Sequence, residues 1–253
     1  MSALATFAAL GATTARAPGV PLVVHFVRHG QATHNVRAEL RREEGCSHGE
    51  FIAQMQADDE FDADLTEMGR QQARAAAAGT AKLSIELVVV SPLSRAIETA
   101  LLIFGDAQSS VPFVSSELLR EWNGLLLNAK RRRRPELAAR FPRVDFAGIP
   151  ESDESWTEVL EPADEVAERG VRFLEWLAQR PEREIAVVAH GGIYAQLFSH
   201  ARVHDDSAFL RRRFGNCEVR SAELSVRASE KGKGGAEFMF GKCPAPATRL
   251  PAS

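Results

Sequence analysis

The sequence predicts one α/β domain with a mostly parallel sheet, over residues 21–242 of a chain of 253. Apolar runs typical of buried strands alternate with segments of helical periodicity along this stretch. Two of the strands end in a His-Gly pair, at His29 and at His190. Because a doubly wound sheet presents its ligands at the carboxyl ends of its strands, we expect the two histidines to meet at one edge.

The first predicted strand, 22–27, leads into a polar loop at 28–35. Residues 36–62 are rich in charge and show little periodicity, which indicates a partly helical surface excursion of the kind that forms a lid. A helix then begins after Thr66, a residue type that favours the N-cap position. The apolar run 86–90 follows and predicts the next strand.

Ser91 and Pro92 predict the start of another helix. A serine side chain caps the first N–H groups, and proline at the first helical position loses nothing by lacking one. This helix runs to about Phe104 and places Arg95 in its first turn. The positive end of a helix is a poor place for a cation, so a nearby anion explains Arg95 better than a solvated surface position does.

The second half of the chain supplies the remaining elements. First come a short strand over 112–114, a loop that holds Glu121 and closes at Gly124, and a basic run with a short helix over 130–141. The strongest helical pattern, over 162–181, is followed by a strand over 185–189 and a helix from Ile193 to His200. The last elements are two strands over 217–226 and 236–240, joined by a polar turn at 229–235. The last two strands predict a hairpin at the sheet edge.

The two ends of the chain differ from the domain between them. Residues 1–20 are rich in Ala and Thr, lack acids and carry only Arg16 as a charge, which predicts a flexible extension; organelle targeting is the alternative. Residues 243–253 mix Pro, Ala and Ser without periodicity, and we expect them to form a disordered tail.

Bulk composition excludes several classes of function. A net charge of −3 and a pI near 6.2 give no basic field that would favour nucleic acid, and no apolar stretch is long enough to cross a bilayer. Cys46, Cys217 and Cys243 lack paired spacing, which favours a reducing compartment, so we expect a cytoplasmic protein. The other histidines lack paired ligand spacing, so we expect no metal and no cofactor. The oligomeric state is left open.

Four strand ends bring polar side chains to one edge of the predicted sheet: Arg28 with His29, Arg95, Glu121 and His190. Guanidinium groups match phosphoryl oxygens in a fork, and a neutral imidazole can attack phosphorus to form a phosphoenzyme. A carboxylic acid can then protonate the leaving alkoxide. This set predicts a phosphate site that requires no metal. The alternatives are a structural role for each histidine and an ordinary ion pair for Glu121.

Four segments of the chain carry signatures of a known family. They are Arg28-His29-Gly30-Gln31-Ala32-Thr33-His34-Asn35, the stretch from Asp62 to Gln72, the stretch from Ser91 to Ala100, and His190-Gly191-Gly192. In order and spacing they resemble the histidine phosphatases, also called the phosphoglycerate mutase-like superfamily, over about residues 22–226. The resemblance implies a three-layer α/β sandwich whose mostly parallel sheet has an antiparallel edge.

The resemblance also implies a role for each matching residue. It makes His29 the phosphorylated nucleophile, and Glu121 the proton donor and later the base for the attacking water. It arranges the other residues of the pocket around the phosphoryl group: Arg28, Arg95, His190 and, as a polar contact, Asn35.

Within the superfamily the chain is most similar to a eukaryotic branch of phosphoglycerate mutase-like proteins that is well represented in plants. Cofactor-dependent mutases carry Glu-Arg where this chain has Glu121-Trp122, and an acid where Gln31 lies. We therefore expect a metal-independent phosphatase that acts on a small phosphorylated molecule. The alternatives are a cofactor-dependent phosphoglycerate mutase and an inactive phosphate-binding module.

The basic run Lys130-Arg131-Arg132-Arg133-Arg134 supports two hypotheses. It could act as a nuclear-localisation or polyanion-binding patch. It could instead overhang the pocket and recognise a second anionic group on the substrate, as a similar arginine cluster in the resembling branch implies. We favour the second hypothesis, with a plain solvated surface run as a further alternative.

Overall fold

The structure is a computed structural model that describes residues 21–105, 110–206, 208–228 and 235–243. The predicted N-terminal extension lies outside this range, as do most of the predicted C-terminal tail and of the turn at 229–235.

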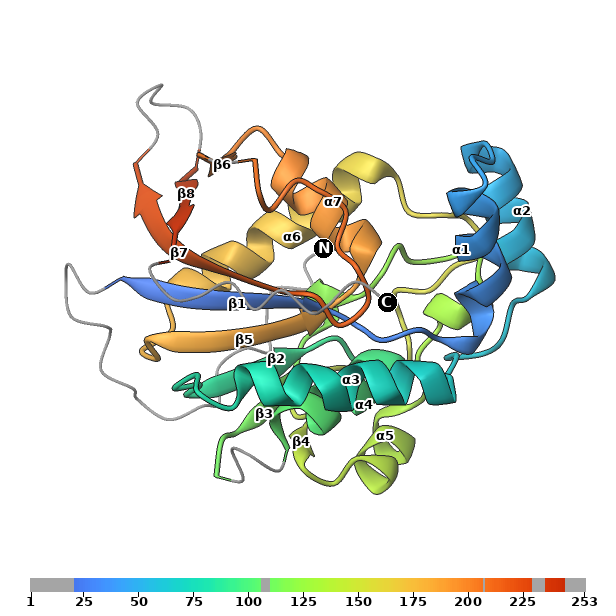
Figure 1. The fold of residues 1–253 in the computed structure, drawn as a ribbon, viewed down its shortest axis with the longest axis horizontal. Coiled ribbons are helices and arrows are strands. Elements are labelled where there is room, and N and C mark those ends of the chain that lie inside the picture. The colour runs from blue at the N-terminus through green and yellow to red at the C-terminus, as the bar shows by residue number, and fades with distance from the viewer. Residues whose placement is uncertain (1–20, 106–109, 207, 229–234, 244–253) are drawn as a thin grey trace.

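A twisted sheet forms the centre of the molecule (Figure 1). Its eight strands within the described residues follow the order β4-β3-β2-β5-β1-β7-β8-β6. Their bounds are β1 Leu22–Arg28, β2 Leu87–Val90, β3 Phe113–Ser115, β4 Val144–Asp145, β5 Glu184–Ala189, β6 Val203–Asp205, β7 Val219–Arg227 and β8 Glu237–Lys242. All pairs are parallel except those of β7, which runs antiparallel to both β1 and β8. The mostly parallel sheet with an antiparallel side is therefore confirmed, and it contains two unpredicted strands, β4 and β6.

The helices lie in layers on the two faces of this sheet (Figure 1). Their bounds are α1 Val36–Glu43, α2 His48–Ala57, α3 Glu67–Thr80, α4 Ser94–Phe104, α5 Arg134–Arg140, α6 Ala163–Ala178 and α7 Gly191–Ser199. Helices α3, α4 and α5 cover one face, α6 and α7 cover the other, and α1 and α2 stand at the carboxyl ends of the strands. The predicted three-layer sandwich is confirmed, and the charged excursion after β1 contains two helices.

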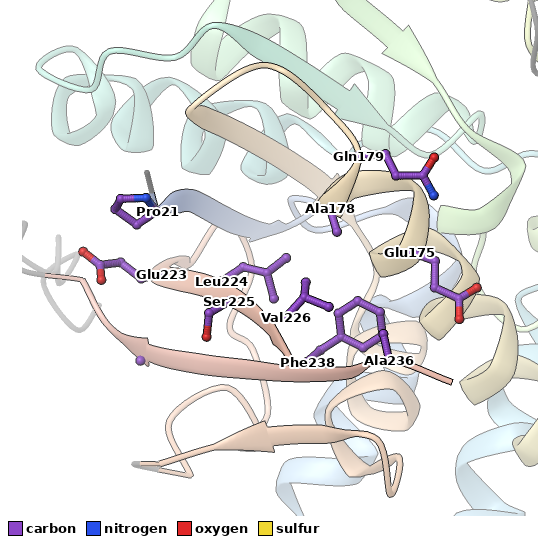
Figure 2. A pocket seen from close by; sticks show the side chains of 11 residues that line it. Pro21, Glu175, Ala178, Gln179, Glu223, Leu224, Ser225, Val226, Ala236 and Phe238 are labelled. Carbon is purple, nitrogen blue, oxygen red and sulfur yellow. The ribbon is translucent and has the colours of Figure 1, made fainter. Parts of the chain in front are cut away.

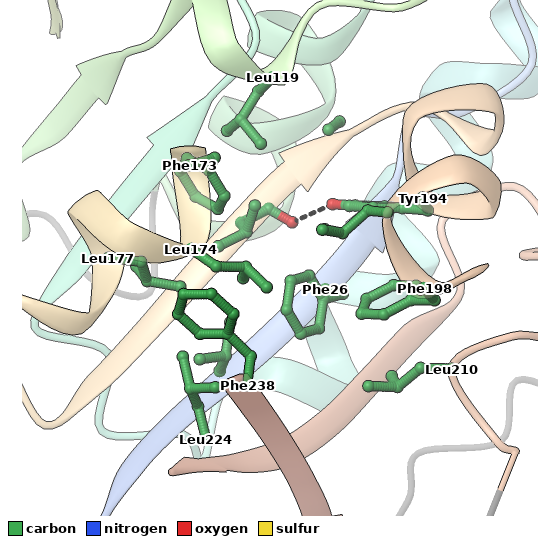
Figure 3. Close-up of a cluster of buried hydrophobic side chains, with 14 of the residues drawn as sticks. Phe26, Leu119, Phe173, Leu174, Leu177, Tyr194, Phe198, Leu210, Leu224 and Phe238 are labelled. Atoms are coloured by element: carbon green, nitrogen blue, oxygen red, sulfur yellow. Dashed lines mark hydrogen bonds between the residues drawn. The ribbon is translucent and has the colours of Figure 1, made fainter. Parts of the chain in front are cut away.

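Alternating strand residues feed two separate apolar cores. Phe26 of β1 faces the α6–α7 layer, where its ring meets Tyr194 and Phe198 edge-on at centroid distances of 5.6 and 5.1 Å. The next residue, Val27, packs into the core beneath α3 and α4. In the first core the buried Tyr194 hydroxyl donates to the carbonyl of Val187 at 2.8 Å (Figure 3), so α7 is fixed to β5 directly after His190. This anchoring fixes the direction of the His190 backbone.

The start of α4 differs from the prediction. The helix begins at Ser94, and Ser91 and Pro92 remain in the connection after β2. The buried carboxylate of Asp62 takes the capping role, because it accepts hydrogen bonds from the Ser94 backbone N–H at 2.9 Å and the Ser94 hydroxyl at 2.5 Å. The predicted cap at Ser91 is therefore wrong: a carboxylate from a distant segment satisfies this helix end, and the Ser91 hydroxyl is engaged by His190.

Candidate active site

A cavity of about 400 Å³ opens at the carboxyl ends of the parallel strands. Its wall contains five of the six residues predicted for the site: Arg28, His29, Asn35, Arg95 and Glu121. The sixth, His190, is fully buried, with its ring centroid 5.0 Å from that of His29. The structure therefore brings all six predicted residues to one place.

His29 follows β1 directly, and its backbone N–H donates to the carbonyl of Ala189 at the end of β5. The Nδ1 atom of its ring lies 2.6 Å from the carbonyl of Gly30. Because a carbonyl only accepts, Nδ1 carries the proton and the lone pair remains on Nε2. Burial, followed by the positive charges of Arg95 and Arg28, holds the pKa of His29 well below its usual range. The ring is thus a neutral imidazole with a free nucleophilic nitrogen.

Two buried arginines flank this ring. Arg95, in the first turn of α4, donates from Nη1 to the carbonyl of Asn128 at 2.7 Å, and burial lowers its pKa to about 10. It remains charged at neutral pH. Arg28 donates to the carbonyl of Phe214 and forms an ion pair with Glu39 at 2.7 Å. The two guanidinium groups supply positive charge directly beside the nucleophilic ring.

His190 is held by a residue whose role the sequence did not reveal. Its Nε2 atom lies 2.8 Å from the Ser91 hydroxyl, which comes from the end of β2 on the neighbouring strand. Burial, then Arg95 and the ring of His29, keep the pKa of His190 well below its usual range. Ser91 is therefore a positioning residue for the second imidazole. The signal available in the sequence was the place of Ser91 directly after a strand, at the edge of the sheet where His29 and His190 also lie.

A third imidazole, His34, is a site residue that sequence reasoning missed. It is buried in the cavity wall, with its ring centroid 6.5 Å from that of His29. Burial and the neighbouring charges of Arg95, His29 and Arg28 lower its pKa well below the usual value. The lack of paired metal-ligand spacing around this histidine carries no information about an anion site. Its place in the loop after β1 was the signal that could have found it.

The residues around His29 leave several buried nitrogen atoms without a hydrogen-bond partner among the described residues. They are Arg28 Nε, Arg95 Nε, His34 Nδ1 and His190 Nδ1. An unpaired buried donor costs about 1–3 kcal/mol, and more for a charged group. Unpaired buried groups of this kind mark places where a bound ion, an ordered water or a catalytic role completes the hydrogen bonding. A tetrahedral oxyanion offers several acceptor atoms and the negative charge that this cluster lacks.

Glu121 lies at the N-terminus of α7. Its two carboxylate oxygens accept hydrogen bonds from the backbone N–H groups of Gly192 at 3.0 Å and Ile193 at 3.1 Å. Both donors belong to the first turn of the helix, so the backbone of α7 fixes the place of the carboxyl group. This arrangement holds the carboxyl group in the same wall as the nucleophilic ring.

Gly192 leaves the space that Glu121 occupies. A Cβ atom at this position would lie 2.1 Å from Glu121 Oε1 and 2.6 Å from Trp122 Cδ1. We expect Gly192→Ala to displace the carboxyl group and to lower kcat by about 10²-fold, the loss that accompanies removal of a general acid. The measurement is kcat on an aryl phosphate together with the melting temperature.

Gly49→Ala is the matched control, because a Cβ atom at Gly49 meets nothing within 4 Å. We expect this variant to keep the parent kcat. Full activity in Gly192→Ala, with the protein folded, would show that the position of the Glu121 carboxyl group does not matter.

Asn35 contributes a polar group to the cavity. Its Oδ1 accepts the backbone N–H of Ala32 at 3.2 Å, which orients the side chain at the start of α1. The amide nitrogen makes no hydrogen bond to a described residue, so it is available as a donor in the wall. This geometry is compatible with the predicted contact to a phosphoryl oxygen.

The segment 214–217 holds the loop of His29 in place. The side chain of Asn216 donates to the carbonyl of His29 at 2.9 Å, and the backbone N–H of Cys217 donates to the carbonyl of Arg28 at 3.0 Å. Cys217 has a φ of 53°, an uncommon conformation for a residue with a side chain. The contact with His29 joins residues 187 positions apart, so no local pattern in the sequence predicts this role.

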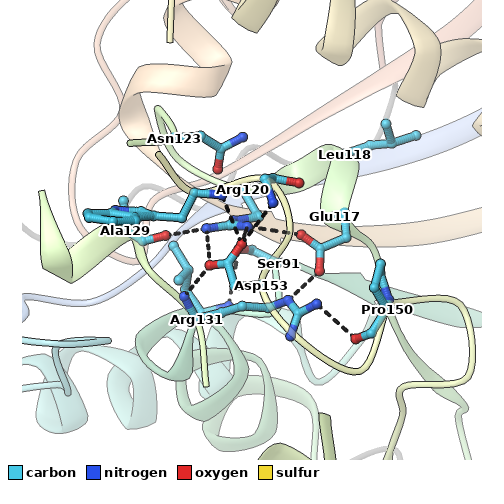
Figure 4. Close-up of polar contacts among 12 residues, drawn as sticks. Ser91, Glu117, Leu118, Arg120, Asn123, Ala129, Arg131, Pro150 and Asp153 are labelled. Carbon is cyan, nitrogen blue, oxygen red and sulfur yellow. Dashed lines mark hydrogen bonds and ion pairs between the residues drawn. The ribbon is translucent and has the colours of Figure 1, made fainter. Parts of the chain in front are cut away.

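None of the residues of the basic run 130–134 is in the cavity wall, which ends at the preceding Asn128 and Ala129. Figure 4 shows Arg131 and Arg120 in a network with two carboxylates. Arg131 is buried, pairs with Glu117 and donates to the carbonyl of Pro150 at 2.8 Å, while Arg120 holds Asp153 at 2.5 and 2.8 Å. The prediction that the run overhangs the pocket is therefore wrong. Its buried member neutralises an acid in a network that supports the Glu121 loop.

A second hollow, of about 650 Å³, lies at the opposite end of the sheet, beside Pro21 at the start of β1 (Figure 2). The ionisable residues in its wall are Glu175 and Glu223. Arg202 pairs with Glu175, and the described residues of the wall itself supply no cation, so this hollow lacks the excess of positive charge that a phosphate site needs.

Two further findings apply to the described ranges only. No group of three or more His, Cys, Asp or Glu residues in them could hold a metal ion. No helix there has the length and apolar character needed to cross a membrane.

The fold and the cavity define a class of protein: an α/β sandwich with an imidazole-centred, arginine-lined anion site at the carboxyl edge of its sheet. Residues 24–230 match the model of the Histidine phosphatase superfamily (branch 1). The chain therefore belongs to the histidine phosphatase superfamily, a family of phosphatase-type enzymes.

Relatives by sequence agree with this assignment. A phosphoglycerate mutase-like protein of Arabidopsis thaliana is 33% identical over 241 residues, which cover 81% of this chain and 85% of that protein. A glucosyl-3-phosphoglycerate phosphatase of Mycolicibacterium vanbaalenii is 31% identical over 177 residues, covering 68% and 70% of the two chains.

Solved structures share the fold. A phosphoglycerate mutase from Bacillus anthracis aligns with a TM-score of 0.52 at 19% identity, covering 80% of this chain and 88% of that one. A mycobacterial glucosyl-3-phosphoglycerate phosphatase in complex with VO3 aligns with a TM-score of 0.50 at 24% identity, covering 89% and 100%.

Proposed function

We propose that the protein hydrolyses a phosphomonoester of a small molecule through a covalent phosphohistidine on His29, without a metal ion. The observation that carries the proposal is the neutral imidazole of His29, whose free Nε2 lies in a cavity lined by buried, partly unpaired guanidinium groups. A neutral ring nitrogen can attack phosphorus, and the arginines can accept the charge that spreads over the phosphoryl oxygens.

The reaction takes two steps. In the first, His29 Nε2 forms a bond to phosphorus, the ester P–O bond breaks, and Glu121 in its acid form gives a proton to the departing alkoxide. In the second, water attacks the phosphoryl group, the P–N bond breaks, and Glu121 takes the proton of that water. Inorganic phosphate leaves, and His29 and Glu121 return to their starting states. Arg28, Arg95, His190 and Asn35 hold the phosphoryl oxygens in both steps.

Positive charge in the site comes from side chains of the chain itself, Arg28 and Arg95, which supports the absence of a metal requirement. The test is turnover of p-nitrophenyl phosphate by purified protein in the presence of excess chelator. We expect the same rate with and without chelator. A rate that disappears with chelator and returns with a divalent cation would contradict this part of the proposal.

Mutase activity is the second candidate, because the Arabidopsis relative is named phosphoglycerate mutase-like. Trp122 stands beside Glu121 where the mutases carry an arginine, and its ring approaches Gly192 instead of presenting a charge to the substrate. Incubation with 3-phosphoglycerate and catalytic 2,3-bisphosphoglycerate separates the two activities. We expect release of inorganic phosphate; formation of 2-phosphoglycerate would establish the mutase instead.

The protonation of His29 gives a prediction on pH. Because burial and two arginines lower its pKa, we expect the ring to stay neutral below the ordinary histidine value of about 6.5. NMR titration of the His29 ring in the ligand-free protein measures this without interference from substrate ionisation. The same ring in the urea-unfolded chain is the matched control. A folded-state pKa at or above the unfolded value would contradict the account.

The same shift has a consequence for stability. The unfolded chain binds protons at His29, His34 and His190 near their ordinary pKa, whereas the folded state keeps these rings neutral. The unfolded state therefore gains protons first as the pH falls, and we expect the free energy of unfolding to decrease below a pH of about 6.5. Chemical denaturation between neutral and mildly acidic pH measures this loss.

A further inference from the structure

We propose that the charged excursion after β1, residues 36–62, positions the two arginines of the phosphate site through the carboxylates of Glu39 and Asp59. Glu39 acts directly on Arg28, and Asp59 acts on Arg95 through one bridging residue. This inference rests on the proposed function, because it adds two positioning residues to the reaction of that same site.

Arg28 is held at both terminal nitrogens of its guanidinium group. Nη2 donates to Glu39 Oε1 at 2.7 Å, and Nη1 donates to the carbonyl of Phe214 at 3.0 Å. The side chains of Arg28 and Glu39 are only 7% and 16% exposed, so little water competes for their contact. Arg28 Nε is buried without a hydrogen-bond partner among the described residues, so it remains available as a donor to a phosphoryl oxygen.

The second carboxylate oxygen of Glu39 fixes the position of the carboxylate itself. It forms an ion pair with Arg213, which directly precedes Phe214 in the chain. Burial alone would raise the pKa of Glu39, but the charges of Arg28 and Arg213 hold it below its usual range. The carboxylate therefore stays ionised at neutral pH and keeps its charge-assisted hydrogen bond to Arg28.

Asp59, just after α2, reaches the second arginine through Asn128. Its Oδ2 accepts the backbone N–H of Leu127 at 2.6 Å, and its Oδ1 accepts the backbone N–H of Asn128 at 2.8 Å and the side-chain amide at 2.9 Å. Asn128 is buried, and its carbonyl accepts the hydrogen bond from Arg95 Nη1 at 2.7 Å. Three hydrogen bonds to one carboxylate thus fix the carbonyl that holds Arg95, whose Nε is again buried and unpaired among the described residues.

The two carboxylates are carried by helices that pack on each other. Ala38 of α1 and Met55 of α2 are buried in one apolar cluster. Arg37 of α1 forms an ion pair with Asp58, which directly precedes Asp59. Movement of either helix would therefore disturb both lines of contact to the phosphate site.

The test compares two substitutions at each carboxylate that remove the same charge. Glu39→Gln and Asp59→Asn keep an amide oxygen that can accept a hydrogen bond, whereas Glu39→Ala and Asp59→Ala remove the acceptor. With p-nitrophenyl phosphate, we expect kcat of each alanine variant to be about tenfold or more below that of its amide counterpart, because a misplacement of about 1 Å can cost about 10²-fold in rate. Since the charge is lost in both, the difference between them reports position.

Combinations with the arginines show whether each carboxylate acts through its own partner. In protein that carries Arg28→Met, we expect the difference between the alanine and amide variants to disappear at Glu39 and to remain at Asp59. In protein that carries Arg95→Met, we expect the reverse. This crosswise pattern follows because residues that act through one another have non-additive effects, whereas independent residues have additive ones. A purely structural role would leave both differences unchanged in both backgrounds.

Glu43→Ala and Asp58→Ala are the matched controls. Glu43 lies on α1 but is exposed and outside the cavity wall. Asp58 binds Arg37 and Gln54 within the excursion, so its loss weakens the excursion without removing a contact to Asn128. We expect both controls to keep kcat near that of the parent. A loss in Asp58→Ala as large as that in Asp59→Ala, at equal melting temperature, would contradict the assignment to Asp59.

The outcomes separate this inference from the proposed function. Equal kcat for the alanine and amide variants, or differences that persist in both arginine backgrounds, would overturn the inference and leave the phosphatase intact. A parent protein that hydrolyses no phosphate ester would overturn the proposed function alone. The same comparison then uses the Kd of inorganic phosphate, measured by calorimetry, and we expect weaker binding in each alanine variant than in its amide counterpart. Equal affinities would then overturn the inference as well.

Discussion

His29→Asn is expected to lower the turnover of p-nitrophenyl phosphate by about 10⁴-fold, the scale of loss when a covalent nucleophile is removed. Asparagine retains a polar group of similar reach but has no lone pair of comparable nucleophilicity on a ring nitrogen. The physical reason is that no other side chain of the site offers an unprotonated nitrogen at the position of His29 Nε2. Steady-state kinetics and far-UV circular dichroism together measure the loss and confirm folding.

His34→Asn is the matched comparison. This ring is buried beside His29 and its pKa is lowered by the same arginines, yet its Nδ1 is a candidate hydrogen-bond partner rather than the nucleophile. We expect a loss of about 10–100-fold, the cost of one hydrogen bond to a charged group. Equal losses in the two variants would mean that the assignment of the nucleophile to His29 is wrong.

Arg95→Met is expected to lower kcat/KM by about 10²–10³-fold, the cost of removing one group that stabilises transition-state charge. A usual core substitution lowers the melting temperature, but we do not expect Arg95→Met to lower that of the ligand-free protein. Arg95 is fully buried, its pKa is lowered to about 10, and its Nε has no partner among the described residues. A buried charge without a close ion-pair partner carries a desolvation cost, and an apolar side chain at this position removes that cost.

Thermal unfolding with and without inorganic phosphate provides the measurement for Arg95→Met. We expect the melting temperature without phosphate to remain near that of the parent or to rise. The parent protein should gain stability from added phosphate, because a ligand that binds only the folded state stabilises it, and the variant should lose this gain. A large fall in melting temperature without phosphate would show that Arg95 is mainly structural, through Asp62 or Asn128.

The part of this protein that sequence reasoning could predict is the part that depends on local pattern. Apolar runs located the central strands, and the rule that ligands gather at carboxyl strand ends brought Arg28, His29, Arg95 and His190 together. The structure confirms the three-layer sandwich, places Arg28, His29 and Arg95 in the wall of one cavity, and places the ring of His190 directly beside that of His29. Each strand end is defined by its own short segment, so no knowledge of distant contacts was needed.

The features that were missed depend on contacts between distant segments. Ser91 faces His190 across 99 positions, and Asp62 caps a helix that begins 32 positions later. A local pattern cannot show such partners, so a Ser-Pro pair resembled an ordinary cap. The prediction for the basic run 130–134 was wrong for a related reason, because the charges in the sequence do not show that Arg131 pairs with Glu117 beneath the loop.

The central claim is that a phosphoryl group becomes covalently attached to His29 during turnover. The most direct measurement is to mix the protein with an excess of phosphate ester, quench it with base during steady state, and locate the label by mass spectrometry. The account predicts a base-stable, acid-labile phosphoryl group on the peptide that contains His29, and none in His29→Asn. An acid-stable label on another residue, or undiminished turnover in His29→Asn, would contradict it.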